Sequence, residues 1–137
     1  MTVVDPTFAG VHHVAVPVTD IERSRDWYEA VLGFRSVVDE ETEDSLVAVT
    51  LEHPTGGIVV CLSAAPERAH ALAGFSPVSL AVASVSELAR WKNHFTTIGV
   101  QHSASREAHL GWALDVTDPD GIRIQLHTRE GVSADVD

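Results

Sequence analysis

Two kinds of hydrophobic spacing follow each other near the start of the chain. Apolar residues stand at every second position in HVAVPV, residues 13–18, and at every third or fourth position through residues 21–31. The first spacing predicts a half-buried strand and the second an amphipathic helix. Thr19 and Glu22 have capping-box spacing, so we expect the helix to start there, and Gly33 should stop it. The stripe expected to face the core is Ile21, Ser24, Tyr28 and Val31, with Trp27 beside it.

The same succession returns in the second half of the chain. Residues 76–83 alternate like a strand, Ser84 and Glu87 repeat the capping-box spacing, and Gly99 follows the helical pattern. Corresponding residues of the two copies lie 64 to 66 positions apart. Such an internal repeat predicts two similar structural units. The second buried stripe is expected to be Val85, Leu88, Trp91 and Phe95.

Three strand-like segments follow each predicted helix. In the first copy they are residues 34–40, 45–52 and 57–63, and in the second copy residues 100–105, 110–117 and 121–127. The fold class is therefore α+β, with two tandem βαβββ modules whose mixed sheets curve into a cleft or part-barrel. We expect a single domain over residues 1–137, with module 1 at about 8–63, a linker at 64–75, module 2 at about 76–128 and a tail at 129–137.

Alternation along these strands predicts which side chains face the cleft. The bulky apolar residues should face the helices, and the positions between them should face inward. Polar side chains gather at those inward positions, as a ligand-binding cavity requires. Trp112 is expected either in the core, which is favoured, or as a stacking wall of the cleft. The other residues expected to face the cleft are His13, Cys61, Ser79, Arg123, Gln125 and His127.

The net charge and the composition of the chain argue against several classes of binding partner. Twenty acidic and nine basic residues give a net charge of −11, which fits solubility and also the attraction of a cationic ligand. Nucleic acids are bound through Lys and Arg, so no nucleic-acid partner is expected. The sequence has no membrane span of roughly 20 apolar residues and no signal-peptide pattern at its start. The single Cys61 excludes an internal disulfide, and a cytoplasmic location is expected.

Two segments together resemble the vicinal oxygen chelate superfamily of glyoxalases, extradiol dioxygenases and bleomycin-resistance proteins. HHVAVPVTDIERSRDWYEAVLGF, residues 12–34, is similar to the family's opening strand and helix, and DPDGIRIQL, residues 118–126, to its closing turn and strand. The resemblance covers roughly residues 8–128. It implies the duplicated βαβββ fold and a homodimer in which two chains complete the clefts.

The resemblance also implies a divalent metal held by one residue on the first strand and one on the last strand of each module. Family enzymes carry His or Glu there, whereas the matching positions here are His13, Cys61, Ser79 and Gln125, with Ser79 taken as the repeat partner of His13. Only His13 agrees with the family. Hydroxyl, thiol and amide groups are poor partners for Fe, Mn or Ni, so no cofactor is expected. A divalent metal on a rearranged set of His13, Cys61 and His127 stays open.

Two functions remain open at this stage. The first is a binder of a small cationic or aromatic molecule with a degenerate metal site, as the resemblance to bleomycin-resistance proteins implies. The second is an enzyme, either a metal-dependent lyase, isomerase or dioxygenase with the rearranged ligand set, or a metal-free catalyst using His13, Arg123 or Asp115. No catalytic residue is assigned. The three departures from the metal pattern favour the binder.

Overall fold

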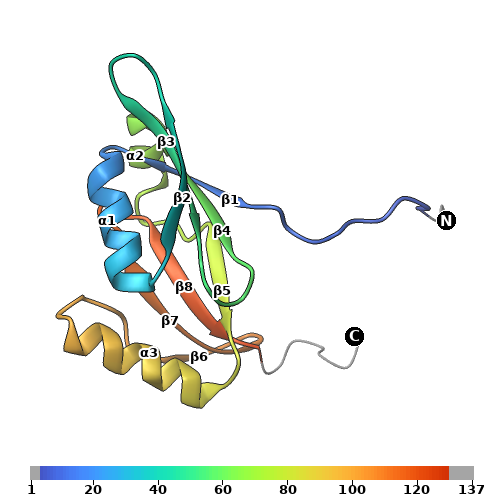
Figure 1. Cartoon of the computed structure of the whole chain (residues 1–137). Helices are drawn as coiled ribbons and strands as arrows, with labels where there is room; N and C mark the ends of the chain where they lie inside the picture. The colour runs from blue at the N-terminus through green and yellow to red at the C-terminus, as the bar shows by residue number, and fades with distance from the viewer. Residues whose placement is uncertain (1–3, 130–137) are drawn as a thin grey trace.

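A computed structural model describes residues 4–129, and the two predicted modules are both present in it (Figure 1). None of the described helices is long and apolar enough to span a membrane. The predicted tail lies outside the described residues, apart from Arg129. Module 1 consists of β1 (Val14–Val18), α1 (Ile21–Leu32), β2 (Arg35–Glu41), β3 (Leu46–Glu52) and β4 (Val59–Ala64).

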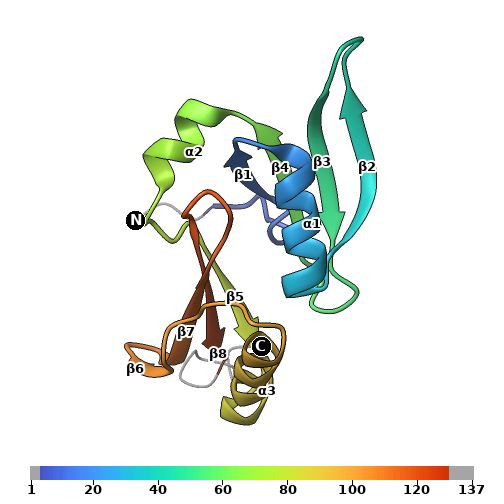
Figure 2. The same ribbon diagram turned by 90° about the vertical axis from the view of Figure 1, so that its left-hand side faces the viewer.

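Module 2 repeats this order of elements. Between the modules, the predicted linker contains a short helix, α2 (Pro66–Leu72), which begins with a proline as first helical turns permit. The connection leads from β4 of the first sheet to β5 of the second sheet (Figure 2). Module 2 consists of β5 (Val78–Val82), α3 (Val85–Thr97), β6 (Arg106–Ala108), β7 (Gly111–Thr117) and β8 (Arg123–Thr128).

The two sheets have the same topology. Their strand orders are β1-β4-β3-β2 and β5-β8-β7-β6, with the first and last strand of each module parallel and the other neighbours antiparallel. Ala15 pairs with Cys61, and Ser79 pairs with Gln125. Both members of the first pair lie 64 residues before their counterparts in the second pair. The α+β fold of two tandem βαβββ modules is therefore confirmed.

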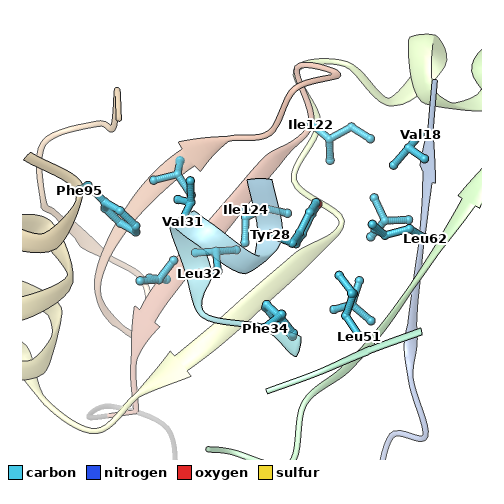
Figure 3. Close-up of a cluster of buried hydrophobic side chains, with 14 of the residues drawn as sticks. Val18, Tyr28, Val31, Leu32, Phe34, Leu51, Leu62, Phe95, Ile122 and Ile124 are labelled. Carbon is cyan, nitrogen blue, oxygen red and sulfur yellow. The ribbon is translucent and has the colours of Figure 1, made fainter. Parts of the chain in front are cut away.

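One hydrophobic core joins the modules. Tyr28, Val31 and Leu32 of α1 lie between side chains of β3 and β4 on one side and of β8 and α3 on the other (Figure 3). Burying a side chain of this size stabilises a fold by about 1.5–3 kcal/mol. Because α1 contributes to the contacts with both sheets, neither module could bury its apolar face alone. The predicted stripe of α1 is confirmed, whereas in α3 Leu88 and Phe95 are buried and Val85 is exposed.

The start of α1 differs from the prediction. Asp20, not Thr19, is the N-cap residue, and its carboxylate accepts a hydrogen bond from the backbone N–H of Arg23 at 3.1 Å. Aspartate suits this place because its negative charge also interacts favourably with the helix dipole. The Thr19 hydroxyl is used elsewhere, since it donates to Asp120. The predicted cap at Ser84 is confirmed, and Gly33 ends α1 with a positive φ of 83°.

The predicted strand at residues 100–105 is wrong. Only His102 forms an isolated bridge there, opposite Val116, and the sixth strand lies later, at Arg106–Ala108. The backbone N–H of Asp115 donates to the hydroxyl of Ser103 at 2.9 Å instead of to a backbone carbonyl. A serine hydroxyl that replaces a backbone partner in this way interrupts the ladder of the sheet.

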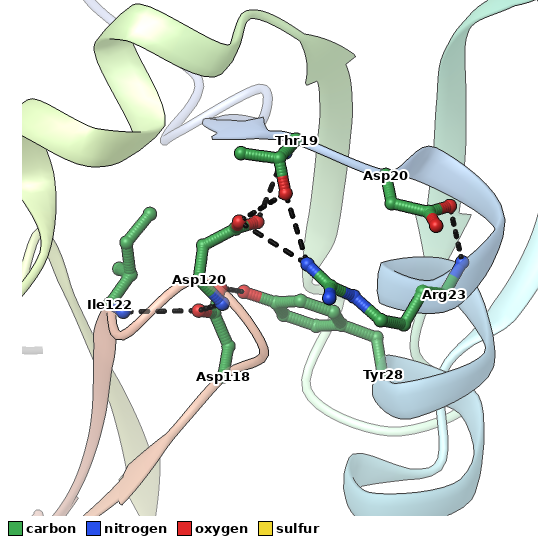
Figure 4. Close-up of polar contacts among 7 residues, drawn as sticks. All are labelled: Thr19, Asp20, Arg23, Tyr28, Asp118, Asp120 and Ile122. Carbon is green, nitrogen blue, oxygen red and sulfur yellow. Dashed lines mark hydrogen bonds and ion pairs between the residues drawn. The ribbon is translucent and has the colours of Figure 1, made fainter.

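The turn at residues 118–121 connects β7 to β8 and also fastens module 2 to module 1 (Figure 4). The Asp118 carboxylate accepts hydrogen bonds from the backbone N–H groups of Asp120 and Ile122, at 2.9 and 3.0 Å, and from the Tyr28 hydroxyl at 2.9 Å. Two of these bonds shape the turn, and the third reaches α1 of the other module. Asp118 and Tyr28 are both buried, so the bond between them is shielded from water.

A second aspartate of the same turn binds the start of α1. Asp120 accepts hydrogen bonds from the backbone N–H and the hydroxyl of Thr19, at 3.1 and 2.5 Å. Arg23 lies 3.5 Å from the same carboxylate and donates to the Thr19 hydroxyl at 3.0 Å. The turn of module 2 is therefore bound at two points of module 1, the buried tyrosine and the first turn of the helix.

We expect Tyr28→Phe to lower the free energy of unfolding by about 1.5–3 kcal/mol, the usual worth of a hydrogen bond to a charged group. The ring stays and only the hydroxyl is lost, so packing is preserved. Urea denaturation followed by circular dichroism measures the change. Trp27→Phe is a suitable control, because Trp27 lies on the same helix and its side chain contacts the Tyr28 ring but not the turn. An unchanged stability of Tyr28→Phe would contradict this role.

The pH dependence of stability follows from the same carboxyl group. Burial raises the pKa of Asp118 above its ordinary value, although the hydrogen bonds from Asp120, Tyr28 and Ile122 act in the opposite direction. The native state then binds a proton more readily than the unfolded state, so this group favours folding more as the pH falls. Wild type should gain stability relative to Asp118→Asn between pH 7 and pH 4. A difference that is flat or has the opposite sign would contradict the raised pKa.

Candidate functional site

The face of the second sheet opposite α3 carries a row of polar side chains. Strand register places Ser79, Gln125 and Asp115 next to one another on β5, β8 and β7. Arg106 of β6 extends the row, because its guanidinium lies 3.1 Å from the Asp115 carboxylate. These residues come from four strands and are brought together only by the pairing of the sheet.

Ser79 fixes the orientation of Gln125. The Ser79 hydroxyl donates a hydrogen bond of 2.8 Å to Oε1 of Gln125. Because the amide oxygen is occupied, the two N–H groups on Nε2 are left to point at another molecule. Gln125 is half-buried and Ser79 is exposed, so the amide is held at the open face of the sheet. The pair presents hydrogen-bond donors in a fixed direction.

Asp115 is held by its neighbours. Its carboxylate is paired with Arg106, its backbone N–H donates to the Ser103 hydroxyl, and its carbonyl accepts from the Ser103 N–H at 2.9 Å. The side chain is only 11% exposed. This carboxylate is therefore already engaged by a guanidinium and largely shielded from a ligand. Its geometry supports a structural role for Asp115 and not the catalytic one considered from the sequence.

A hollow of about 490 Å³ lies over this part of the sheet. It combines three of the predicted cleft residues, Ser79, Gln125 and His127, with the turn between β6 and β7. The sequence did not predict this turn as part of the site, because it placed the sixth strand at residues 100–105. No sequence pattern indicated that residues 108–110 lie beside β8. We call this cavity the module-2 hollow. Its lining residues are Ser79, Ala81, Ala108, His109, Leu110, Gln125, His127, Thr128 and Arg129.

His127 offers one free ring nitrogen to the hollow. Its Nδ1 lies 2.7 Å from the carbonyl oxygen of Thr128, and a carbonyl only accepts, so Nδ1 carries the proton. In the neutral ring Nε2 is then an acceptor, and within residues 4–129 it has no hydrogen-bond partner. The module-2 hollow is therefore lined by a hydrogen-bond acceptor, Nε2 of His127, and by the amide donors of Gln125, two residues earlier on β8.

The other predicted cleft residues lie apart from the module-2 hollow. The guanidinium of Arg123 donates through Nε to the carbonyl of Gly74 at 3.0 Å, which ties it to the linker. Trp112 shares the face of β7 that carries buried Leu114 and Val116, so it points away from Gln125. Arg123 lies on the less buried face of β8 together with Gln125 and His127, but its guanidinium is bound to the linker.

His13 and Cys61 belong to module 1. Cys61 lies beside Thr50, with 3.7 Å between its sulfur and the threonine hydroxyl. His13 precedes β1, is exposed, and has its Nδ1 3.0 Å from that of His12. Neither residue lines the module-2 hollow. The module-2 hollow therefore does not combine the two halves of the predicted cleft.

Strand register also corrects the repeat partner of His13. Ala15 pairs with Cys61 as Ser79 pairs with Gln125, so Ser79 is the counterpart of Ala15. The same offset makes Pro77 the counterpart of His13. The sequence alone is compatible with offsets of 64 to 66 residues between corresponding positions of the two modules, so it does not decide between Pro77 and Ser79. The register of the hydrogen-bonded strands fixes a single offset.

The metal expected of enzymes of this fold does not fit the residues present. Within residues 4–129 no group of three or more His, Cys, Asp or Glu side chains is close enough to hold an ion. Pro77 has no donor atom in its side chain, and Gln125 offers only a neutral amide oxygen, which also accepts the hydrogen bond from Ser79. Divalent transition metals bind best to imidazole and carboxylate groups, and this set has too few of them.

Comparison with solved structures finds the same fold in several proteins. A glyoxylase/bleomycin resistance protein/dioxygenase domain from Frankia sp. EAN1pec has a TM-score of 0.68 and 21% identity, covering 89% of this chain and 98% of that chain. TnmS3, an antibiotic binding protein from Streptomyces sp. CB03234, has a TM-score of 0.69 and 18% identity, covering 90% and 98%. At these identities the likeness shows the fold alone.

A third structure contains a metal. It is a mutant of the genomically encoded fosfomycin resistance protein FosX from Listeria monocytogenes, complexed with Mn(II) and 1S,2S-dihydroxypropylphosphonic acid. It has a TM-score of 0.68 and 13% identity, covering 90% of this chain and 92% of that chain. A comparison with curated proteins by sequence finds no match.

A family model agrees with the fold and with the residues that carry the resemblance. The model for the Glyoxalase/Bleomycin resistance protein/Dioxygenase superfamily matches residues 10–126, from before the first strand to the closing strand. Both segments on which the resemblance rests lie inside that range. The chain therefore belongs to the Glyoxalase/Bleomycin resistance protein/Dioxygenase superfamily.

Proposed function

We propose that this protein binds a small aromatic molecule in the module-2 hollow without a catalytic metal. The observation that carries the proposal is the hydrogen bond from Ser79 to Gln125, which fixes the amide of a residue that lines the hollow. Polar groups held in place before a ligand arrives cost less entropy on binding. The departures from the metal pattern support a binder over a metal enzyme.

The lining of the hollow indicates the chemistry of the ligand. Gln125 would donate to a carbonyl or other acceptor, and Nε2 of His127 would accept from a hydroxyl. Ala81, Ala108 and Leu110 supply apolar contacts for a ring. Arg129 is the charged residue at the rim, which disfavours a cation here. The acidic residues 39–44 lie in the hairpin of β2 and β3 instead. We therefore propose a neutral aromatic ligand with a carbonyl group for this hollow.

Membership of the family adds support. TnmS3 is an antibiotic binding protein, so the same fold serves as a binder elsewhere.

We also propose that two copies of this chain form a homodimer in the cytoplasm. The face carrying Gln125 is open in the single chain, and Val4, Phe8 and Val11 at the start of the described residues are exposed apolar side chains. Sedimentation at increasing protein concentration measures the association.

We expect 4-hydroxyacetophenone, which combines a ring with a carbonyl and a hydroxyl, to bind in the module-2 hollow. A titration followed by ¹H–¹⁵N NMR should shift the amides of β5 and β8 and the side-chain amide of Gln125. Gln125→Leu should weaken binding about tenfold, the value of one hydrogen bond of about 1.4 kcal/mol. 4-Ethylphenol, which lacks the carbonyl, should bind wild type and Gln125→Leu equally. Trp112→Phe, on the other face of the same sheet, serves as the control variant.

Metal binding separates this proposal from the metal-dependent alternative. Protein purified without a tag or a chelator should contain substoichiometric metal, and calorimetric titration with Zn(II), Mn(II), Ni(II) and Fe(II) should give no tight site, because the donor set is incomplete. One metal per chain that is lost in His13→Ala would overturn the proposal. Lyase, isomerase and dioxygenase assays would then be the next experiments.

A further inference from the structure

A second hollow, of about 380 Å³, lies between the last turn of α1 and the helix α3. It shares no lining residue with the module-2 hollow. Residues of both modules form it, including Gly33 and His53 from module 1 and Trp91 and His94 from module 2. Figure 1 shows the C-terminal end of α1 directed toward α3. We call it the junction hollow.

The junction hollow contains the negative end of a helix. The last carbonyl groups of a helix have no partner within it and carry a partial negative charge. The imidazole of His94 donates through Nε2 to the carbonyl of Val31 at 2.9 Å, and that of His53 through Nε2 to the carbonyl of Leu32 at 2.8 Å. The carbonyl of Ala30 accepts no hydrogen bond from any residue in the described range 4–129. Ala30 lines the hollow, and its carbonyl belongs to this negative end of the helix.

The remaining polar groups of the junction hollow are also suited to a positive charge. Because Nε2 of His94 carries its proton, Nδ1 of the neutral ring is an acceptor. Glu87 contributes a half-exposed carboxylate, and the half-buried ring of Trp91 can contact a cation through its face. A carbonyl, an imidazole nitrogen, a carboxylate and an indole face together favour a ligand that donates hydrogen bonds and is cationic.

Arg90 already interacts with one of these cation-binding groups, the carboxylate of Glu87. Its guanidinium lies 3.1 Å from Glu87, and its side chain is 77% exposed. An ion pair at such exposure is worth little, so a cationic ligand can replace Arg90 as the partner of the carboxylate. The arginine therefore acts as a competitor for the ligand and not as part of its binding site.

A smaller cavity continues the junction hollow inward. It measures about 80 Å³ and shares Leu32, His53 and Trp91 with the junction hollow. Its other walls include Phe34 and Leu126, which belong to the shared core. The inner end is thus apolar and narrow, whereas the outer end is polar, as an amphipathic ligand with an aromatic part requires.

We propose that the junction hollow is a second binding site, specific for small aromatic ammonium compounds. The ammonium group is bound by Glu87 and the carbonyl of Ala30, and the ring lies against Trp91 with its edge toward the inner cavity. The junction hollow and the module-2 hollow have no lining residue in common, and the inner cavity shares only Ala81 with the module-2 hollow, so the two proposed ligands are held by different polar groups. Because residues of both modules line the junction hollow, binding there would also depend on the contact between the modules.

Tryptamine, indole-3-acetate and 3-methylindole test the proposal, because they carry the same ring with a positive, a negative and no charge. Titrations of the full chain followed by ¹H–¹⁵N NMR should show tryptamine binding at least tenfold more tightly than either of the others. The indole N–H of Trp91 and the backbone amides of Gly33 and His94 should shift, and the side-chain amide of Gln125 should not. Equal affinities of the three compounds, or shifts confined to Gln125 and its neighbours, would overturn the proposal.

Two substitutions on the same turn of α3 have opposite expected effects. Glu87→Gln should weaken tryptamine binding at least fivefold, and Arg90→Ala should strengthen it, because the competing guanidinium is removed. A merely structural role of the ion pair would make both variants change binding in the same direction, which would contradict the proposal. Both residues are at the surface, and thermal unfolding of each variant checks that the chain remains folded. Gln125→Leu should leave tryptamine affinity unchanged, which separates this site from the module-2 hollow.

Discussion

The hydrogen bond between Tyr28 and Asp118 is the constraint on which the arrangement of the two modules depends. Asp118 is a buried carboxylate, and burial without partners would be costly. Its partners are two N–H groups of its own turn and the tyrosine of the other module, so the turn is complete only when the modules are together. The same contact places α1 between the two sheets, where its side chains fill the shared core. Burial also raises the pKa of Tyr28 far above its ordinary value, so the hydroxyl stays a donor across the physiological range.

This packing decides where ligands can bind. Because the apolar faces of both sheets are used for the shared core, the opposite faces are open, and their polar side chains are available. In module 2 that face carries the fixed amide of Gln125 and the free nitrogen of His127. In module 1 the equivalent positions hold Ala15, Cys61 and Thr50, which offer weaker hydrogen-bonding groups. One duplicated unit has therefore produced two chemically different surfaces, and only the second is lined as a polar site within the described part of the chain.

Much of the fold could be predicted from the sequence, because it depends on short-range patterns. The period of the apolar residues identified α1, α3 and most of the strands, but not the short helix α2, and the repeat identified the modules. The N-cap of α1 was assigned to Thr19 because both Thr19 and Asp20 suit that place, and the decision depends on Asp120, about 100 residues away. The candidate site could be predicted only in part. Ser79, Gln125 and His127 were found by alternation, but His109 and Leu110 were not, since their place depends on the strand that Ser103 interrupts.

Native-state hydrogen exchange tests most directly whether the two modules are one cooperative unit. The amides of Leu62 in β4 and Leu126 in β8 lie in the two different sheets, and both residues are buried in the shared core. If the core and the Asp118 turn make folding of each module depend on the other, both amides should exchange only through global unfolding, with the same free energy. Tyr28→Phe should lower both values by the same amount. A value for Leu62 that differs from that of Leu126 by several kcal/mol, or a loss confined to one sheet, would contradict the account.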